Sequence, residues 1–580
     1  MAPTEGPVRA PVADASRVHR PAHPVRVVTA ASLFDGHDAA INIIRRLLQA
    51  QGAEVVHLGH NRSVQEVVTA AVQEDAQAVA VSSYQGGHIE YFEYLLDQLA
   101  ARGRPDVRVY GGGGGVIVPA EADRLHRAGV ARIFRPEDGQ RLGLEGMVNT
   151  IIQECDRALL PQAGTLPGVL AGDHAALARA ITGIEDASID QASLAELRAA
   201  AAAHPAPALG VTGTGGSGKS SLTDELVRRL RLDQQDKVTV AVLAVDPTRS
   251  KSGGALLGDR LRMNSIASDR VYMRSLATRG AGTELPAALP AIVDACRAAG
   301  FDLVIVETPG VGQGGSGIVR LVDRSLYVMT PEYGAPTQLE KIDMLDYADA
   351  VAINKFDRRG AADALRDVRR QLARAPERRG RPHDQLPVFG TVASRFNDDG
   401  VTALYEYLRD QLAADGLAVA PGALAQLQGR TSSAPDAAVP PSRSNYLAEV
   451  AKAVRAYHAR TAEAVVAARR HQQAAATAAM LAERGTPSAE IDELIASLDE
   501  AIDDHSKALL DEWPALAAKY GHDDGGRRSL AGTLVPRVSL PRFGDDGDLL
   551  RFLRAEHLPG HFPYTAGVFP FRRASEGTTR

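Results

Sequence analysis

The sequence contains little cysteine, and this shortage excludes several protein classes. Cys155 and Cys296 are the only two in 580 residues, and neither has a Cys or His neighbour at metal-binding spacing. A disulfide framework and a structural zinc cluster are therefore excluded, and the reducing cytoplasm is the expected compartment. Long apolar runs are also missing, since no stretch approaches the about 18 residues of a membrane helix. Residues 1–24 lack the apolar stretch of a signal peptide, so we predict a cytoplasmic chain with a disordered start.

An excess of positive charge is missing as well. Lys and Arg number 65 against 71 Asp and Glu, which gives a formal net charge of −6. This balance provides no general attraction for nucleic acid or for an anionic membrane, so neither is an expected partner. At about 150 residues per domain, the length predicts three or four domains.

The first predicted domain covers residues 25–158. Short β-branched runs alternate there with helical periods, such as residues 38–51, where Ile41, Ile44 and Leu48 share a face. This alternation predicts an α/β fold with a parallel, doubly wound sheet of flavodoxin type. The predicted strands are Val25–Ala30, Glu54–Leu58, Ala78–Ser82, Val107–Tyr110 and Ala131–Phe134.

A second α/β domain is predicted over residues 208–415, between two linkers. Residues 159–207 are Ala-rich with prolines and predict a helical linker. Residues 416–444 collect Pro, Ser, Gly and Ala without periodicity and predict a flexible one. The predicted strands include Leu209–Thr212, Lys237–Val245, Leu303–Glu307, Ser325–Val328 and Ala350–Ile353.

The third segment, residues 445–580, begins with two long helical patterns. They cover residues 445–475 and 487–520 and are interpreted as an antiparallel pair. Two roles stay open for this pair, a dimer interface and an intramolecular brace.

Residues 213–220, with the sequence GTGGSGKS, match the P-loop pattern between an apolar strand and an amphipathic helix. Glycines let successive backbone N–H groups turn toward phosphate oxygens. Lys219 offers its charge to the β and γ phosphates, and the Ser220 hydroxyl can bind Mg²⁺. The other predicted phosphate contacts are Gly215, Gly216, Ser217 and Gly218.

The choice of base is predicted from an NKxD sequence after the strand Ala350–Ile353. It consists of Asn354, Lys355 and Asp357. The Asp357 carboxylate can accept from the ring N–H and the amino group of guanine, and adenine lacks that pair of donors. Because the wrong base leaves a polar group unpaired, GTP is favoured over ATP.

Carboxylates that follow two other strands predict the magnesium site. Asp246 ends one strand and Glu307 ends another, at the edge where the nucleotide binds. Small G-proteins usually carry a glutamine directly after the glycine at position 310, whereas this chain has Val311 and reaches its glutamine only at Gln313. We therefore expect slow intrinsic hydrolysis, with Lys219, Glu307 and Gln313 as candidate catalytic residues.

A histidine follows the first strand of the first domain. Asp35 lies two residues before His37 and could accept from one ring nitrogen, which leaves the other for a metal. A lone histidine is usually a surface residue. Residues 82–87 and 111–115, however, follow the third and fourth strands at the same sheet edge. Their small residues predict a slot for a large ligand beside His37.

These residues resemble the cobalamin-binding domain of adenosylcobalamin-dependent acyl-CoA mutases, whose pattern is DxHxxG…SxL…GG. The resemblance implies that His37 binds cobalt in place of the cofactor's own dimethylbenzimidazole, whose tail fills the slot. The chain departs from the pattern at Ala40 and Tyr84. The implied cofactor-binding residues are Asp35, His37, Ser82, Tyr84, Gly112 and Gly113.

The second domain resembles the G-protein chaperones of those mutases. Residues 246–249, 254–263 and 307–313 are similar to their nucleotide-sensing segments, although Gly314–Gly317 replaces acidic residues. The resemblance implies that Arg262 approaches the nucleotide. It also implies a magnesium site of Ser220, the Val245 carbonyl, Asp246, Asp259, Glu307 and Thr308.

The order of the segments is similar to that of fused isobutyryl-CoA mutases. Residues 562–571 look like the lead-in to their substrate-binding barrel, so we expect the chain to end before that barrel. The resemblance implies GTP hydrolysis that gates cofactor loading or repair, and interconversion of isobutyryl-CoA and butyryl-CoA once the barrel binds acyl-CoA. Isomerisation by this chain alone is not expected. A homodimer or a separate mutase subunit is the expected partner. The alternative is a stand-alone G-protein chaperone or cobalamin sensor that acts on a separate mutase.

Overall fold

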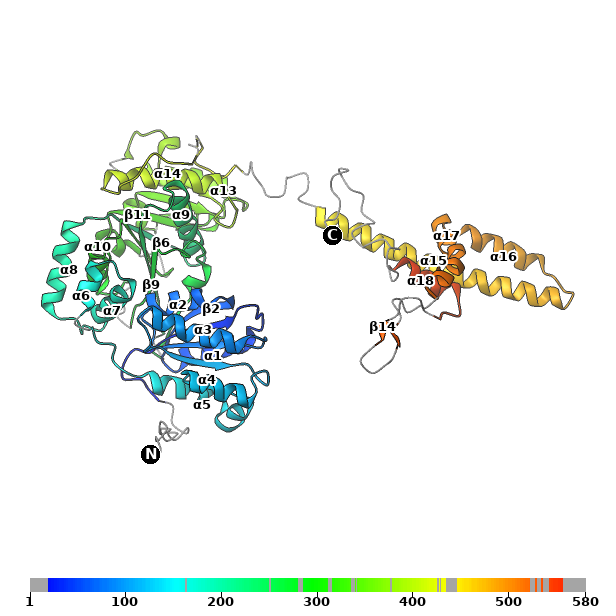
Figure 1. Cartoon of the computed structure of the whole chain (residues 1–580). Coiled ribbons are helices and arrows are strands. Elements are labelled where there is room, and N and C mark those ends of the chain that lie inside the picture. The colour runs from blue at the N-terminus through cyan, green and yellow to red at the C-terminus, as the bar shows by residue number, and fades with distance from the viewer. Residues whose placement is uncertain are drawn as a thin grey trace, which may run out of the picture. The chain divides into compact units, whose positions relative to one another are not determined.

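The computed structural model of the chain divides into two compact units, Met1–Asp436 and Ala437–Arg580 (Figure 1). No helix among the described residues is long and apolar enough to cross a membrane. The residues that the structure describes are 19–161, 164–249, 252–279, 285–310, 315–334, 339–340, 342–375, 378–424, 427, 429–433, 446–521, 527–528, 534–535 and 542–555.

Five parallel strands of the first domain stand in the order β5-β4-β3-β1-β2, which is the flavodoxin order, so the fold prediction is confirmed. Every residue of β1 and β3 is buried, as expected for strands covered on both faces. The strands are β1 (Arg26–Ser32), β2 (Glu54–Arg62), β3 (Ala78–Ser82), β4 (Arg108–Gly112) and β5 (Arg132–Phe134), and the helices are α1 (Ala39–Ala50), α2 (Val64–Gln73), α3 (His88–Ala101), α4 (Pro119–Ala128) and α5 (Pro136–Cys155).

A sixth strand joins this sheet from the second domain. β8 (Ala255–Leu257) runs parallel to β2, with Ala255 opposite Glu54 and Leu257 opposite Val56. Ala255 and Leu257 are buried in the core of the first domain. The two domains therefore share a sheet, and the segment that forms β8 belongs to the predicted nucleotide-sensing residues 254–263.

Seven parallel strands form the second sheet, in the order β13-β12-β11-β6-β10-β7-β9. The strands are β6 (Ala208–Gly213), β7 (Val240–Asp246), β9 (Val271–Ala277), β10 (Leu303–Glu307), β11 (Arg324–Met329), β12 (Ala350–Asn354) and β13 (Val388–Thr391). The helices are α9 (Lys219–Asp233), α10 (Leu289–Ala298), α12 (Met344–Tyr347), α13 (Ala361–Leu372) and α14 (Asp399–Ala414), and a short 3-10 helix, η1 (Asp259–Arg262), follows β8.

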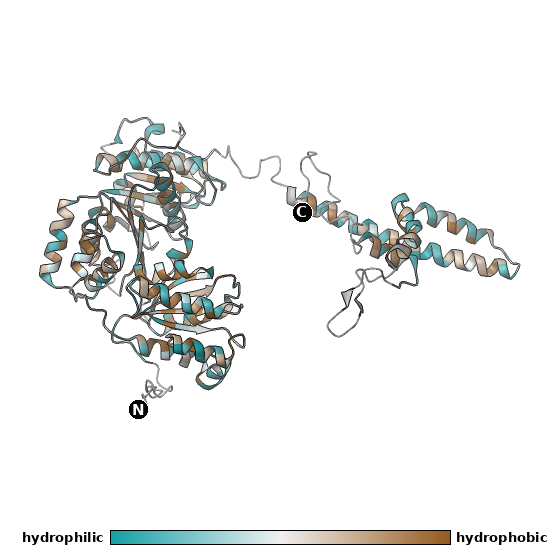
Figure 2. Cartoon of the chain, in the orientation of Figure 1, coloured by the Kyte–Doolittle hydropathy of each residue, from teal (hydrophilic) through white to brown (hydrophobic). Residues whose placement is uncertain are grey.

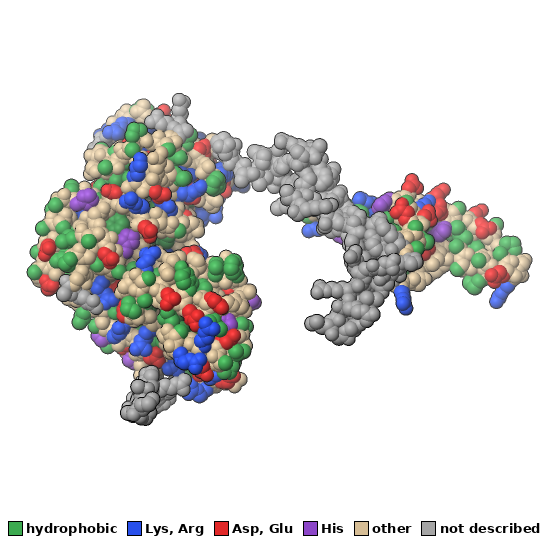
Figure 3. Space-filling model, in the orientation of Figure 1, with side chains coloured by type: hydrophobic (Ala, Val, Ile, Leu, Met, Phe, Trp, Pro, Cys, Tyr) green, Lys and Arg blue, Asp and Glu red, His purple; other side chains and the backbone are tan. Residues whose placement is uncertain are grey.

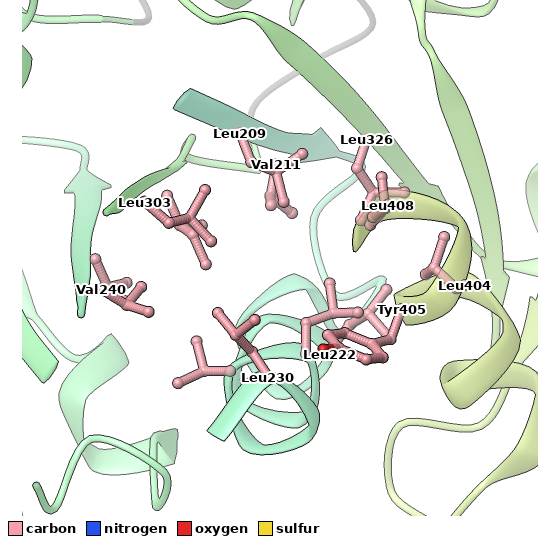
Figure 4. Close-up of a cluster of buried hydrophobic side chains, with 14 of the residues drawn as sticks. Leu209, Val211, Leu222, Leu230, Val240, Leu303, Leu326, Leu404, Tyr405 and Leu408 are labelled. Atoms are coloured by element: carbon pink, nitrogen blue, oxygen red, sulfur yellow. The ribbon is translucent and has the colours of Figure 1, made fainter. Parts of the chain in front are cut away.

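The core on one face of this sheet holds the phosphate-binding elements in place. Leu222 of α9 and Leu404 of α14 pack with Leu209 and Val211 of β6, and all four side chains are buried (Figure 4). Burial of one such side chain contributes about 1.5–3 kcal/mol. Brown hydrophobic colour runs through the strands of both sheets, whereas the helices carry teal on their outer faces (Figure 2).

Three helices occupy the predicted linker of residues 159–207. They are α6 (Thr165–Leu170), α7 (His174–Glu185) and α8 (Gln191–Ala203). Leu177, Ile181 and Leu197 are buried against β-strands and α10 of the second sheet. These helices therefore form a layer on that sheet (Figure 1).

The residues of the unit Ala437–Arg580 that the structure describes are mostly helical, and the prediction of one helix over residues 487–520 is wrong. The second helical pattern contains two helices, because Asp503 caps a new one by accepting from the Ser506 N–H at 2.9 Å. Arg554 donates to Asp503 and Ser506 and stabilises this corner. Acidic side chains are prominent on the face of this unit that Figure 3 shows. Its elements are α15 (Tyr446–Glu483), α16 (Ala489–Glu500), α17 (Asp504–Gly521), α18 (Asp546–Arg554), β14 (Arg527–Arg528) and β15 (Leu534–Val535).

Candidate functional site

Asp35 and His37 lie on the loop after β1, and the carboxylate orients the ring. Asp35 Oδ1 accepts from the His37 backbone N–H and lies 2.8 Å from His37 Nδ1. Because a carboxylate only accepts, Nδ1 donates in this contact, and Nε2 is the ring nitrogen that faces away from Asp35 and is available to a metal. The Asp35 side chain is 0% exposed, whereas that of His37 is 67% exposed. A buried carboxylate therefore orients an accessible imidazole.

Hydrogen bonds keep the Asp35 carboxyl ionised. Burial alone would raise its pKa, but the backbone N–H groups of Tyr84 and His37 and the His37 ring outweigh burial and lower the pKa. The Tyr84 N–H donates to Asp35 Oδ2 at 2.6 Å, and its ring centroid lies 5.7 Å from that of His37. Tyr84 therefore joins the site through its backbone as well as its ring.

A cavity of about 280 Å³ opens beside this loop, between α1, α5 and the ends of β3, β4 and β5. Its walls are largely apolar, from Ile41, Ile44, Phe134 and Met147 among others. Ser82 also lines it, and the buried Ser82 Oγ has no hydrogen-bond partner among the described residues. A large apolar ligand with one polar atom at that hydroxyl fits this lining, as the resemblance to cobalamin-binding domains implies.

The glycine run after β4 brings two loops close together at the cavity. A Cβ atom added to Gly113 would lie 2.0 Å from the Ser83 carbonyl oxygen, so only glycine fits there. Ser83 donates its N–H to the Gly112 carbonyl at 2.8 Å. Ser82, Gly112 and Gly113 are thus brought together as the sequence predicted.

Two glycines of the predicted P-loop adopt backbone conformations that favour glycine. Gly216 and Gly218 have φ values of +73° and +90°, which glycine adopts without strain. Lys219 Nζ donates to the carbonyls of Gly213 and Thr214 at 3.2 and 3.3 Å. The Ser217 hydroxyl also donates to the Thr214 carbonyl, and these hydrogen bonds stabilise the curved loop.

The NKxD residues are tied to the P-loop. Asn354 Nδ2 donates to the Ser217 carbonyl at 2.8 Å, and Lys355 Nζ donates to the Gly216 carbonyl at 2.7 Å. Asp357 is exposed, so its carboxylate is accessible to a guanine base. The residues predicted to contact the base and those predicted to contact the phosphates are therefore hydrogen-bonded to each other.

Sequence reasoning missed the loop after β13. The Ala393 N–H donates to Asn354 Oδ1 at 3.0 Å, and the Thr391 hydroxyl lies 3.3 Å from the same atom. The only sequence signal was a short apolar run ending in small polar residues. Ala393 and Thr391 therefore hold the side chain of Asn354, a predicted base-binding residue, in place.

The predicted magnesium residues gather in part. Ser220 Oγ donates to Glu307 Oε1 at 2.7 Å, which joins α9 to the end of β10. Asp246 ends the neighbouring strand β7, directly after the buried Val245. The Thr308 hydroxyl lies 2.8 Å from that of Thr212. Oxygen donors of this kind suit Mg²⁺, so the residues present fit the ion.

Three other predicted residues are less fully described. Arg262 is exposed at the end of η1. The Asp259 side chain and Gln313 lie outside the described residues, as does the segment 562–571.

The interface between the two domains was also missed by sequence reasoning. Glu74, at the end of α2, is fully buried and accepts from Ser275 N and Oγ, each at 3.0 Å, and from Arg260 at 3.1 Å. The Glu54 carboxylate contacts Arg26 and Arg279. Burial alone would raise the pKa of Glu54, but the positive charges of Arg26 and Arg279 outweigh the effect of burial, so the pKa is lowered.

Comparison with known proteins agrees with this geometry. The family model "B12 binding domain" matches residues 25–140, and "Methylmalonyl Co-A mutase-associated GTPase MeaB" matches residues 177–420. The fused isobutyryl-CoA mutase of Nocardia farcinica is 58% identical over 97% of this chain and 53% of its own length. That of Cupriavidus metallidurans is 55% identical over 97% of this chain and 52% of its own length. The chain is therefore similar to fused isobutyryl-CoA mutases over nearly its whole length.

The chain spans about half the length of these two fused isobutyryl-CoA mutases. It carries the family's cobalamin-binding and GTPase portion, which the two family models cover. A putative GTPase of Pyrococcus horikoshii is 34% identical over 41% of this chain and 74% of its own length. The chain is therefore assigned to an enzyme family with sites for cobalamin and GTP.

Proposed function

We propose that this chain binds adenosylcobalamin with His37 as the lower cobalt ligand and hydrolyses GTP to gate cofactor loading or repair. One observation carries the proposal. His37 stands exposed with its ring fixed by the buried Asp35, and Tyr84, whose ring contacts that of His37, lines an apolar cavity. That combination suits a cofactor whose own base is displaced into the cavity while a protein imidazole binds the metal.

In the first domain, the chain's residues bind and orient. His37 Nε2 would hold the cobalt, and Asp35 would keep the opposite ring nitrogen protonated. The cavity wall would take the displaced base, with the Ser82 hydroxyl donating to its ring nitrogen. When bound, adenosylcobalamin supplies the radical chemistry of the rearrangement.

In the second domain, the framework holds GTP. Backbone N–H groups of the P-loop and Lys219 would bind the phosphates, and Asp357 would read guanine. Ser220, Asp246 and Glu307 would hold Mg²⁺, with Asp259, Thr308 and the Val245 carbonyl completing the set. Mg²⁺ supplies positive charge to the β and γ phosphates.

The shared sheet supports the gating part of the proposal. Asp246 precedes β8 and η1 follows it, so a strand of the first domain's sheet lies between two segments that the nucleotide is proposed to contact. Arg260 of η1 is also held by Glu74 of the first domain. A change at the nucleotide therefore has a covalent and hydrogen-bonded path to the cobalamin domain.

The complete reaction is proposed for the longer family protein. There, a substrate barrel would bind acyl-CoA and interconvert isobutyryl-CoA and butyryl-CoA. This chain alone is proposed to hydrolyse GTP without isomerising acyl-CoA, and to work in the cytoplasm as a homodimer or with a separate mutase subunit. Mutase turnover by the purified chain would contradict this division of labour.

The experiment is a titration of the full chain with adenosylcobalamin, followed by visible absorption at neutral pH. Because an imidazole nitrogen replaces another nitrogen base, we expect wild type to bind the cofactor with a spectrum close to that of the free cofactor, whereas bound His37→Ala shifts to the base-off spectrum. His204→Ala, which removes an exposed histidine at the end of α8, is the matched control and keeps the wild-type spectrum. A base-off spectrum in bound wild type, or a wild-type spectrum in bound His37→Ala, would reject His37 as the cobalt ligand.

A further inference from the structure

We propose that Asn61, on β2, is a positioning residue for His37. This inference rests on the proposed role of His37 in binding cobalt. Asn61 is not part of the resemblance to the mutases, and its side chain does not line the cavity. Its contacts reach the loop that carries Asp35 and His37.

Asn61 holds this loop at two consecutive residues. Its side-chain Oδ1 accepts from the Phe34 N–H at 2.8 Å, and its own N–H donates to the Asp35 carbonyl at 3.2 Å. Asp35 in turn fixes the His37 ring through Nδ1. A path of two hydrogen bonds through Asp35 therefore leads from β2 to the imidazole, and the bond to Phe34 holds the same loop beside it.

The loop needs such support because its backbone is strained. Phe34 has φ +64°, in the left-handed region that a bulky side chain rarely adopts. Its side chain is 79% exposed, so burial of the ring does not offset the strain. The hydrogen bond from its N–H to Asn61 stabilises this conformation directly.

The end of β2 is shaped for this contact. The pairing of β1 with β2 is irregular between Thr29 and Ser32, where Ala30 lies opposite Gly59 and Ser32 lies opposite Arg62. This irregularity leaves Asn61 outside the regular register, so its N–H is available to the loop. Asn61 has φ +55°, and asparagine tolerates this region better than most residues.

Two substitutions separate the hydrogen bond from the backbone conformation. Asn61→Gly keeps the left-handed backbone and removes the side-chain acceptor. Asn61→Asp keeps both, because a carboxylate oxygen can accept from the Phe34 N–H. Asn397 also has a positive φ, of +51°, and lies in the second domain, so Asn397→Gly is the matched control.

The experiment titrates each full-length variant with adenosylcobalamin and records both the affinity and the base-off spectrum. A lost hydrogen bond of ordinary strength predicts about fivefold weaker binding for Asn61→Gly, with a larger base-off fraction at saturation because the imidazole is less well placed to bind cobalt. Asn61→Asp should restore both readouts to within about twofold of wild type. Asn397→Gly should leave both unchanged.

Two results would overturn the proposal: wild-type binding and spectrum in Asn61→Gly, or an equal loss in Asn61→Asp. His37→Ala, measured in parallel, identifies which claim fails. If bound His37→Ala becomes base-off and Asn61→Gly binds and absorbs like wild type, only the role of Asn61 falls. If bound His37→Ala keeps the wild-type spectrum, the cobalt-ligand assignment falls and the positioning role falls with it.

Discussion

Substitution of Glu74 by Gln tests the connection between the two domains. The Glu74 carboxylate is fully buried and accepts from Ser275, Arg260 and Arg26. Gln keeps the volume and one acceptor but removes the charge, so the buried Arg260 guanidinium loses the carboxylate that it contacts. Removing one partner of a buried pair costs about 3–5 kcal/mol. With one acceptor retained, we expect about 3 kcal/mol, a change of roughly 100-fold in the unfolding equilibrium.

Urea unfolding followed by far-ultraviolet circular dichroism measures this effect. With a slope of about 3 kcal/mol per molar urea, the midpoint should fall by about 1 M. Glu93→Gln is the matched control, because the Glu93–Arg124 pair lies at the surface and its loss should change the midpoint little. Equal midpoints for Glu74→Gln and wild type would refute the claim that this carboxylate stabilises the interface.

Three further predictions concern the interface and the two sites. Arg26 and Arg279 lower the pKa of Glu54 below the ordinary 4.5, so this carboxylate stabilises the fold above pH 4.5 and stabilises it less as the pH falls. The difference in melting temperature between wild type and Glu54→Gln should therefore narrow from pH 6 to pH 3. A constant difference would contradict this prediction. Gly113→Ala should destabilise the first domain by about 1–3 kcal/mol in thermal melts and weaken cobalamin binding in titrations. Gly115→Ala is the control, because its added Cβ meets open space, and it should change neither stability nor binding. Lys219→Ala should slow GTP hydrolysis about 100-fold or more in a phosphate-release assay, and near wild-type turnover would rule out its role at the phosphates.

Local signals in the sequence predicted much of the fold and of the two sites. The P-loop, the NKxD residues and the Asp35–His37 pair depend on spacings of a few residues at strand ends, and the structure places each at the expected sheet edge. The strands β3 and β10 were predicted with their exact bounds.

Features that depend on distant parts of the chain were not predictable in this way. β8 has three residues, and its partner β2 lies about 200 positions earlier, so no local pattern indicates the pairing. Glu74 reads as an ordinary helix-end carboxylate until Ser275 and Arg260 are brought to it. The role of Asn61 follows from an irregular register, which depends on two strands at once.

The central claim is that His37 binds cobalt, and electron paramagnetic resonance of the chain loaded with cob(II)alamin tests it most directly. The protein is prepared with ¹⁵N-labelled histidine and natural-abundance cofactor. A ¹⁵N nucleus splits each cobalt line into two, whereas the ¹⁴N of the cofactor's own base splits it into three. We predict twofold splitting in the labelled chain and threefold splitting in the unlabelled one. Threefold splitting in both would contradict the account.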